Sequence, residues 1–82
     1  MIDRITGMIL EVNVLPEYEG QHDQEIDIVL DSGPTVQMCV TEDTVDILRN
    51  SRFSLMSFDI TDRTPCGQHV RAINFQFESK ND

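Results

Sequence analysis

The stretch EIDIVLDSGPTVQMCVT, residues 25–41, contains two strand patterns joined by a turn. Polar and apolar residues alternate on both sides of the turn, which is typical of strands with one buried and one solvated face. Asp, Ser, Gly and Pro at 31–34 favour a chain reversal. The stretch therefore predicts an antiparallel hairpin. Its buried face would carry Ile26, Ile28, Leu30, Val36, Met38 and Val40.

Three further segments predict strands. In 4–14 the apolar positions Met8, Leu10, Val12 and Val14 share one parity. In 52–61 apolar residues occupy both parities, which predicts either a bulge near Leu55-Met56 or burial on both faces. In 69–78 the predicted buried face carries Ile73, Phe75 and Phe77.

A short helix is predicted between the third and fourth strands. Thr41 can cap its first turn, and Glu42 and Asp43 there are favoured by the helix dipole. Val45, Ile47 and Leu48 would form its apolar side, and Arg49-Asn50 its end. Five strands with this helix predict a mainly β protein, a small five-stranded antiparallel OB-like barrel. The rival arrangement is an open five-stranded meander with the helix packed on one face.

The first eleven residues, MIDRITGMILE, resemble the start of the RuvA subunits that bind Holliday junctions. The later stretch VQMCVTEDTVDILRNSRF has a similar place in the order of elements. The resemblance implies an OB barrel. The glycine-rich helix-hairpin-helix motifs of RuvA, and its Gly-Val-Gly-Tyr stretch, do not occur in these residues, so no function is carried over.

The chain has 82 residues and predicts a single domain, 1–82, with residues 79–82 as a frayed tail. Six Lys and Arg oppose fifteen Asp and Glu, for a net charge of −9. Such a charge repels nucleic-acid phosphates and anionic membranes, and it favours a basic protein partner. Residues 1–41 alone hold eight acids and one base, or −7.

Much of that charge is predicted to lie on one outer sheet face and the long loop beside it. Acidic residues alternate with core residues along neighbouring predicted strands, and others follow in loop 16–24. Such a face can present itself to a basic protein surface, or it can simply be solvated. The candidate protein-binding residues are Glu11, Glu17, Glu19, Asp23, Glu25, Asp27 and Asp31.

An oligonucleotide-binding barrel is the alternative, because OB barrels bind single strands by stacking bases on aromatic side chains beside basic ones. The candidate residues are Arg63, Arg71, Phe75 and Phe77, although both phenylalanines share the parity of Ile73 and fit the core equally well. A third alternative is a self-associating β domain without a ligand of its own.

The segment TPCGQHVRAINFQF, residues 64–77, contains a Cys66-x-x-His69 pair. With His22 from the other long loop, and Asp23 or Asp62 as a fourth ligand, it could form a zinc site if the two loops converge. The other interpretation is a turn made by Pro65 and Gly67. Cys66 beside His69 lacks the surroundings of a catalytic thiol. We therefore expect a non-enzymatic protein without a cofactor.

The predicted location is the cytoplasm. The chain has two cysteines, too few for a disulfide framework, and its N-terminus lacks a signal-peptide pattern.

Overall fold

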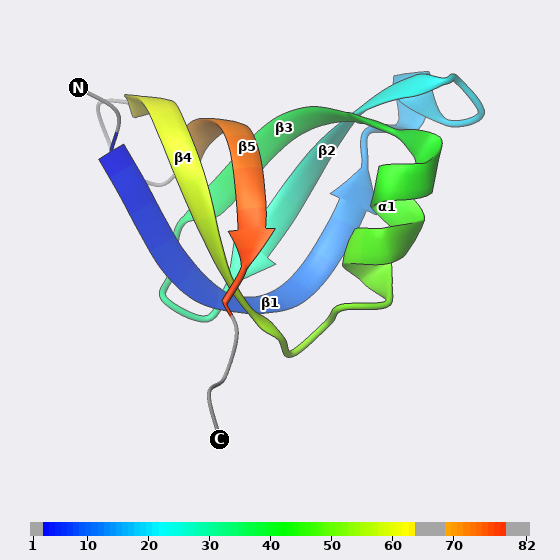
Figure 1. Ribbon diagram of the computed structural model, residues 1–82. Helices are drawn as coiled ribbons and strands as arrows, with labels where there is room; N and C mark the ends of the chain where they lie inside the picture. Colours follow the sequence, from blue (N-terminus) through cyan, green and yellow to red (C-terminus); the bar gives the residue numbers. More distant parts are fainter. Residues whose placement is uncertain (1–2, 64–68, 79–82) are drawn as a thin grey trace.

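The computed structural model describes residues 3–63 and 69–78, apart from the side chains of residues 62 and 63. Its five strands close into a barrel in the order β1-β2-β3-β5-β4 (Figure 1). The predicted frayed tail, 79–82, lies outside the described residues. The elements are β1 (Asp3–Val14), the 3-10 helix η1 (Pro16–Tyr18), β2 (Asp23–Leu30), β3 (Thr35–Thr41), α1 (Glu42–Arg49), β4 (Leu55–Arg63) and β5 (His69–Phe77).

The predicted small OB-like barrel, with its helix between the third and fourth strands, is confirmed. Pairing of β1 with β4 closes the sheet, so the open meander is excluded. The barrel is not wholly antiparallel, because β3 and β5 pair in parallel over Thr35–Gln37 and His69–Arg71. The parallel pair arises because α1 carries the chain away from β3 before the β4–β5 hairpin returns to it.

Strand β1 is long and curved, and it joins two parts of the barrel (Figure 1). Residues 3–8 pair with β4, and residues 9–14 pair with β2. The register shifts between Ile9 and Glu11, so Leu10 is a bulge residue. Before the bulge the odd-numbered residues, such as Ile9, face inward. After it the inward parity is even, and Val12 is buried. The prediction that Met8 and Leu10 share the buried face of Val12 was therefore wrong: both are only partly buried.

Gly7 lies at the bend of β1 and is buried. A Cβ there would approach the Ser32 hydroxyl to 2.9 Å and the Asp31 carboxylate to 3.2 Å. Glycine is thus what allows the turn between β2 and β3 to pack against β1.

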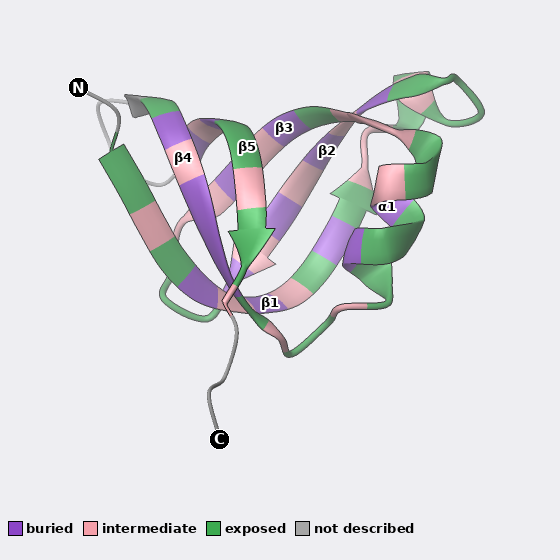
Figure 2. Cartoon of the chain, viewed as in Figure 1, coloured by how far each residue is buried: buried purple, intermediate pink, exposed green. Residues whose placement is uncertain are grey.

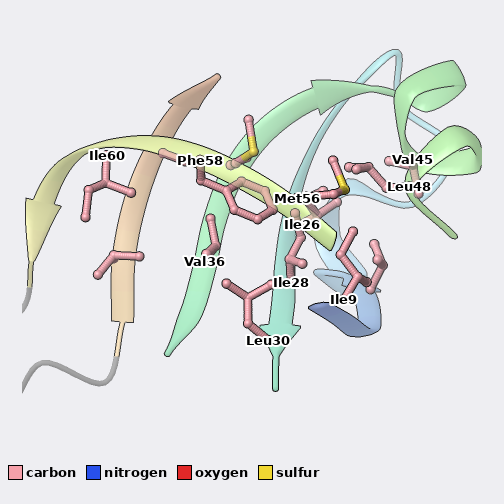
Figure 3. Close-up of a cluster of buried hydrophobic side chains, with 14 residues drawn as sticks. Ile9, Ile26, Ile28, Leu30, Val36, Val45, Leu48, Met56, Phe58 and Ile60 are labelled. Atoms are coloured by element: carbon pink, nitrogen blue, oxygen red, sulfur yellow. The ribbon is translucent and has the colours of Figure 1, made fainter. Parts of the chain in front are cut away.

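The core fills the barrel and continues under the helix. Phe58 lies near the middle of the cluster (Figure 3). Figure 2 shows buried and partly buried residues alternating along β2, as its sequence predicts. The buried hydrophobic residues are Ile9, Val12, Ile26, Ile28, Leu30, Val36, Met38, Val45, Leu48, Met56, Phe58, Ile60, Val70 and Ala72.

The last two strands depart from the predicted periodicity. The β4–β5 register shifts on both sides of Ile60, not at Leu55-Met56. Met56, Ser57 and Phe58 are all buried, which agrees with the other alternative, burial on both faces. In β5, Ala72 faces inward, while Ile73 is 54% exposed. The prediction that Ile73 is a core residue was wrong, because the irregular register changes the inward parity along β5.

Helix α1 begins as predicted. The Thr41 hydroxyl accepts a hydrogen bond from the Thr44 amide at 3.3 Å, which caps the helix. Val45 and Leu48 are buried against the barrel, but Ile47 is 51% exposed and lies outside the apolar side predicted for it. No helix in the described part of the chain has the length and apolar character needed to cross a membrane.

The two phenylalanines of β4 and the loop before it offer a matched test of the core. We expect Phe58→Leu to lower the free energy of unfolding by about 1–3 kcal/mol, because Phe58 is 0% exposed and the shorter side chain leaves a cavity. The same change at Phe53, which is 63% exposed, should cost no more than about 0.5 kcal/mol. Urea denaturation measures both. Equal losses would contradict this placement of the core.

Candidate binding face

Polar side chains line up across the outside of β1, β2 and β3. In one row Asn13 pairs with Asp27, and Asp27 pairs with Gln37. In the next row Glu25 pairs with Cys39. These positions alternate with the buried residues, so they all face away from the core. We call this surface the acidic face; it consists of Glu11, Asn13, Glu25, Asp27, Gln37 and Cys39.

The position of this face within the fold is informative. OB barrels bind their ligands on the sheet surface around β2 and β3, between the β1–β2 and β4–β5 loops. The acidic face occupies that surface, and residues 15–22 form the β1–β2 loop beside it. Glu17 and Glu19 are exposed in this loop, and Asp23 is exposed where β2 begins.

Arg71 lies beside the face on β5 and pairs with one of its carboxylates. Its Nη1 and Nη2 donate to the two carboxylate oxygens of Glu25, the second at 3.3 Å. The Glu25 side chain is 17% exposed and that of Arg71 is 41% exposed. Since Gln37 pairs with Arg71 and Glu25 lies on β2, the ion pair spans β3. Glu25 was predicted to contact a protein partner and Arg71 to contact an oligonucleotide, so this ion pair joins residues from two different hypotheses.

Asp27 has a carboxylate oxygen with no partner. Its Oδ1 is buried, and no described residue donates a hydrogen bond to it. A buried carboxylate oxygen without a donor is costly, because it has lost water and gained nothing in return. A donor from another molecule would relieve this cost once the Asp27 side chain turns outward to meet it.

The other predicted acidic residues differ in what they contact. Glu11 is exposed, and its Oε2 accepts from Asn13 Nδ2 at 3.1 Å. Asp31 is not on the face, contrary to its predicted place there. It lies at the turn after β2, where its Oδ1 accepts from the Met8 amide at 2.8 Å. The carboxylate thus supports the bend of β1.

The predicted nucleic-acid residues do not gather into one platform. Phe75 packs against the core between Phe58 and Phe77, and it meets Phe77 edge to face at 6.0 Å. Phe77 pairs with Met56 but is 45% exposed, so its predicted place on the buried face of this strand was wrong. Both aromatic residues have the inward parity, whereas Arg71 faces outward with Glu25. The Arg63 side chain lies outside the described residues.

The two histidines of the zinc hypothesis lie at opposite ends of β3. His22 precedes Asp23, which pairs with Thr41, whereas His69 pairs with Thr35. They are therefore roughly 20 Å apart along the strand. His22 and His69 therefore do not lie together as that hypothesis required, and Cys66 lies outside the described residues. Within residues 3–63 and 69–78, no three potential metal ligands form a group.

Sequence reasoning missed a hollow between α1 and the β1–β2 loop. It is an open hollow of about 340 Å³, lined by carboxylates of both elements. One signal was visible in advance, because Glu42, Val45 and Asp46 have the spacing of one helix face. The loop that covers this face could be found only from the fold.

Comparison of the chain with protein-family models, curated proteins and solved structures finds no match. The resemblance of the first residues to RuvA is thus without support from these comparisons, and a functional argument has to come from the residues themselves.

A double-mutant cycle on the ion pair tests the geometry of the face. Arg71→Gln should lower the free energy of unfolding by about 1–2 kcal/mol, because it leaves the largely buried Glu25 carboxylate unpaired. Adding Glu25→Gln should recover much of that loss. We expect a coupling energy of about 1 kcal/mol from urea denaturation. Strictly additive effects would show that the pair does not form in solution.

Proposed function

We propose that this protein is a non-enzymatic module that binds a basic surface of another protein through its acidic face, as an accessory subunit or inhibitor. We place it in the cytoplasm, where the exposed free thiol of Cys39 would stay reduced. The observation that carries the proposal is the buried, unpartnered Oδ1 of Asp27 in the middle of that face. A lysine or arginine of the partner would supply the missing donor.

The charges around Asp27 support a cationic partner. Glu11, Glu25 and Asp27 carry three negative charges on the face. Arg71 pairs with Glu25, and Arg49 and Arg52 line a hollow with Glu11 and Asn13 at the edge of the face. Glu17, Glu19 and Asp23 add three more in the adjoining loop and at the start of β2. A field of one sign raises the association rate with an oppositely charged surface and selects against others.

The same field argues against the oligonucleotide alternative. Affinity for nucleic acid comes largely from lysine and arginine at the phosphates. The guanidinium of Arg71 is already paired with Glu25, and Arg49 and Arg52 line a hollow that also contains Glu11. Phosphates approaching Asp27 would be repelled.

The test is affinity capture from a lysate of the source organism, followed by a binding measurement with the purified partner. We expect Asp27→Asn to weaken binding at least about tenfold, because it removes the charge from the hydrogen bond that the partner would make. The matched control is Asp43→Asn, which makes the same change on the exposed start of α1 and should leave affinity unaltered.

Two results would contradict the proposal. One is a captured partner whose affinity is the same for Asp27→Asn and the native chain. The other is binding of a fluorescently labelled single-stranded oligonucleotide that Arg71→Gln abolishes and Asp27→Asn strengthens. That pattern would favour the oligonucleotide alternative instead.

A further inference from the structure

Strand β5 has a neighbour on both sides only at its start. On one side it pairs with β4 from Val70 to Phe77. On the other side it pairs with β3 only over His69–Arg71, after which the two strands diverge (Figure 1). From Ala72 to Phe77, no strand in the described part of the chain pairs with this second side. We call it the open edge of β5.

The backbone groups at the open edge are available for pairing. The Glu78 amide donates to Leu55 O at 3.1 Å, so the backbone of Glu78 points toward β4. In an antiparallel ladder, successive residues direct their amide and carbonyl groups to alternate sides. Phe75 and Phe77 therefore direct theirs away from β4, into the open edge. The register with β4 is regular over residues 74–77, so this alternation is not interrupted there.

The side chains of this segment do not protect the edge. Native proteins guard exposed edges with charged residues, proline or a bulge. Residues 72–77, AINFQF, contain no charge and no proline. The register shift at Ile73 lies near the start of the segment and leaves the rest regular. Ile73 and Phe77 are 54% and 45% exposed, so two large apolar side chains face water along this edge.

The ends of the open edge carry opposite charges, which favours a second copy of this chain as its occupant. Arg71 precedes the uncharged segment and Glu78 follows it. When two copies of β5 pair antiparallel about a two-fold axis, the Arg71 end of each meets the Glu78 end of the other. Arg71 already pairs with Glu25, but its side chain is 41% exposed and a guanidinium has five donors. It can therefore approach a second carboxylate.

One register joins the two edges best. Opposed side chains in an antiparallel pair point to the same face of the sheet, so a two-fold pairing is centred on a residue. Centring on Phe75 places Ile73 of each copy opposite Phe77 of the other. Centring on Asn74 would place Phe77 opposite Arg71, where β3 already occupies the edge. Centring on Gln76 would leave Ile73 opposite a residue beyond the end of the strand.

We propose that the open edge of β5 pairs with the same edge of a second copy, in an antiparallel two-fold dimer centred on Phe75. The backbone groups of Phe75 and Phe77 exchange water for protein partners, and Ile73 and Phe77 cover each other. A single pair of strands makes a small interface, so the dimer is a weak one. The acidic face lies on β1, β2 and β3, so this proposal does not rest on the proposed function.

Sedimentation velocity of the full chain at concentrations from about 10 μM to 1 mM tests for the dimer. We expect a shift from monomer to dimer as the concentration rises. Ile73→Lys should weaken association about tenfold or more, because it places a charge against Phe77 of the second copy. The matched control is Ile47→Lys on α1, where the residue is 51% exposed. It makes the same change in net charge and should leave the dimer unaltered.

A charge pair tests the register. Ile73→Glu and Phe77→Lys should each weaken self-association. When the two variants are mixed, a heterodimer should form. In it the introduced carboxylate lies opposite the introduced ammonium group, while the native Phe77 and Ile73 meet on the other side of the axis. Native mass spectrometry separates the heterodimer from both homodimers by mass.

Amide hydrogen exchange identifies the edge that is used. Dimerisation should slow exchange at Phe75 and Phe77 but not at Gln76, whose amide already points toward β4. A chain that stays monomeric to about 1 mM, unchanged dimerisation of Ile73→Lys, or a mixture without the heterodimer would each overturn the inference. So would a captured protein that slows exchange at Phe75 and Phe77 in a monomeric chain, because the edge would then serve a different partner.

Discussion

Closure of the barrel depends on one strand pairing with two neighbours at once. Strand β1 reaches β4 with its first half and β2 with its second, and the bulge at Leu10 supplies the change of direction between them. The close packing of Gly7 against the β2–β3 turn and the bond from Met8 to Asp31 hold this bend. Without it the sheet would have two open edges. The register of the acidic face follows from the same pairing.

Carboxylates gather on the acidic face and in the hollow beside α1 for different structural reasons. On the acidic face, alternation along β1 and β2 puts Glu11, Glu25 and Asp27 on the outer side of the sheet, and the ion pair with Arg71 offsets the charge of Glu25. In the hollow, helix periodicity and the β1–β2 loop bring carboxylates into one lining. Charges of one sign on a surface repel each other, and a bound cation would reduce that repulsion.

The sequence predicted what depends on local pattern and missed what depends on register. Alternation in 25–41 identified β2 and β3, and Thr41 identified the start of α1. Bulges are not visible in such patterns, so Met8, Leu10 and Ile73 were assigned to the wrong side. Asp31 was assigned to the acidic face because it has the same parity as Asp27. It lies just after the end of β2, where its carboxylate accepts a hydrogen bond from the Met8 amide. The Glu25–Arg71 pair joins residues 46 positions apart and follows only from the parallel β3–β5 pairing.

Among the described residues, the pairing between β3 and β5 is the shortest in the barrel, with three residues on each strand. Local opening of a barrel starts where two strands share the fewest hydrogen bonds, and here that place, the β3–β5 pairing, lies beside the acidic face. The Glu25–Arg71 ion pair crosses the β3–β5 pairing, from β5 to β2. A partner bound over β2, β3 and β5 would hold these strands together, so binding would slow amide hydrogen exchange in β3 and β5. Under the proposed function, binding on this surface would therefore also make the barrel more rigid.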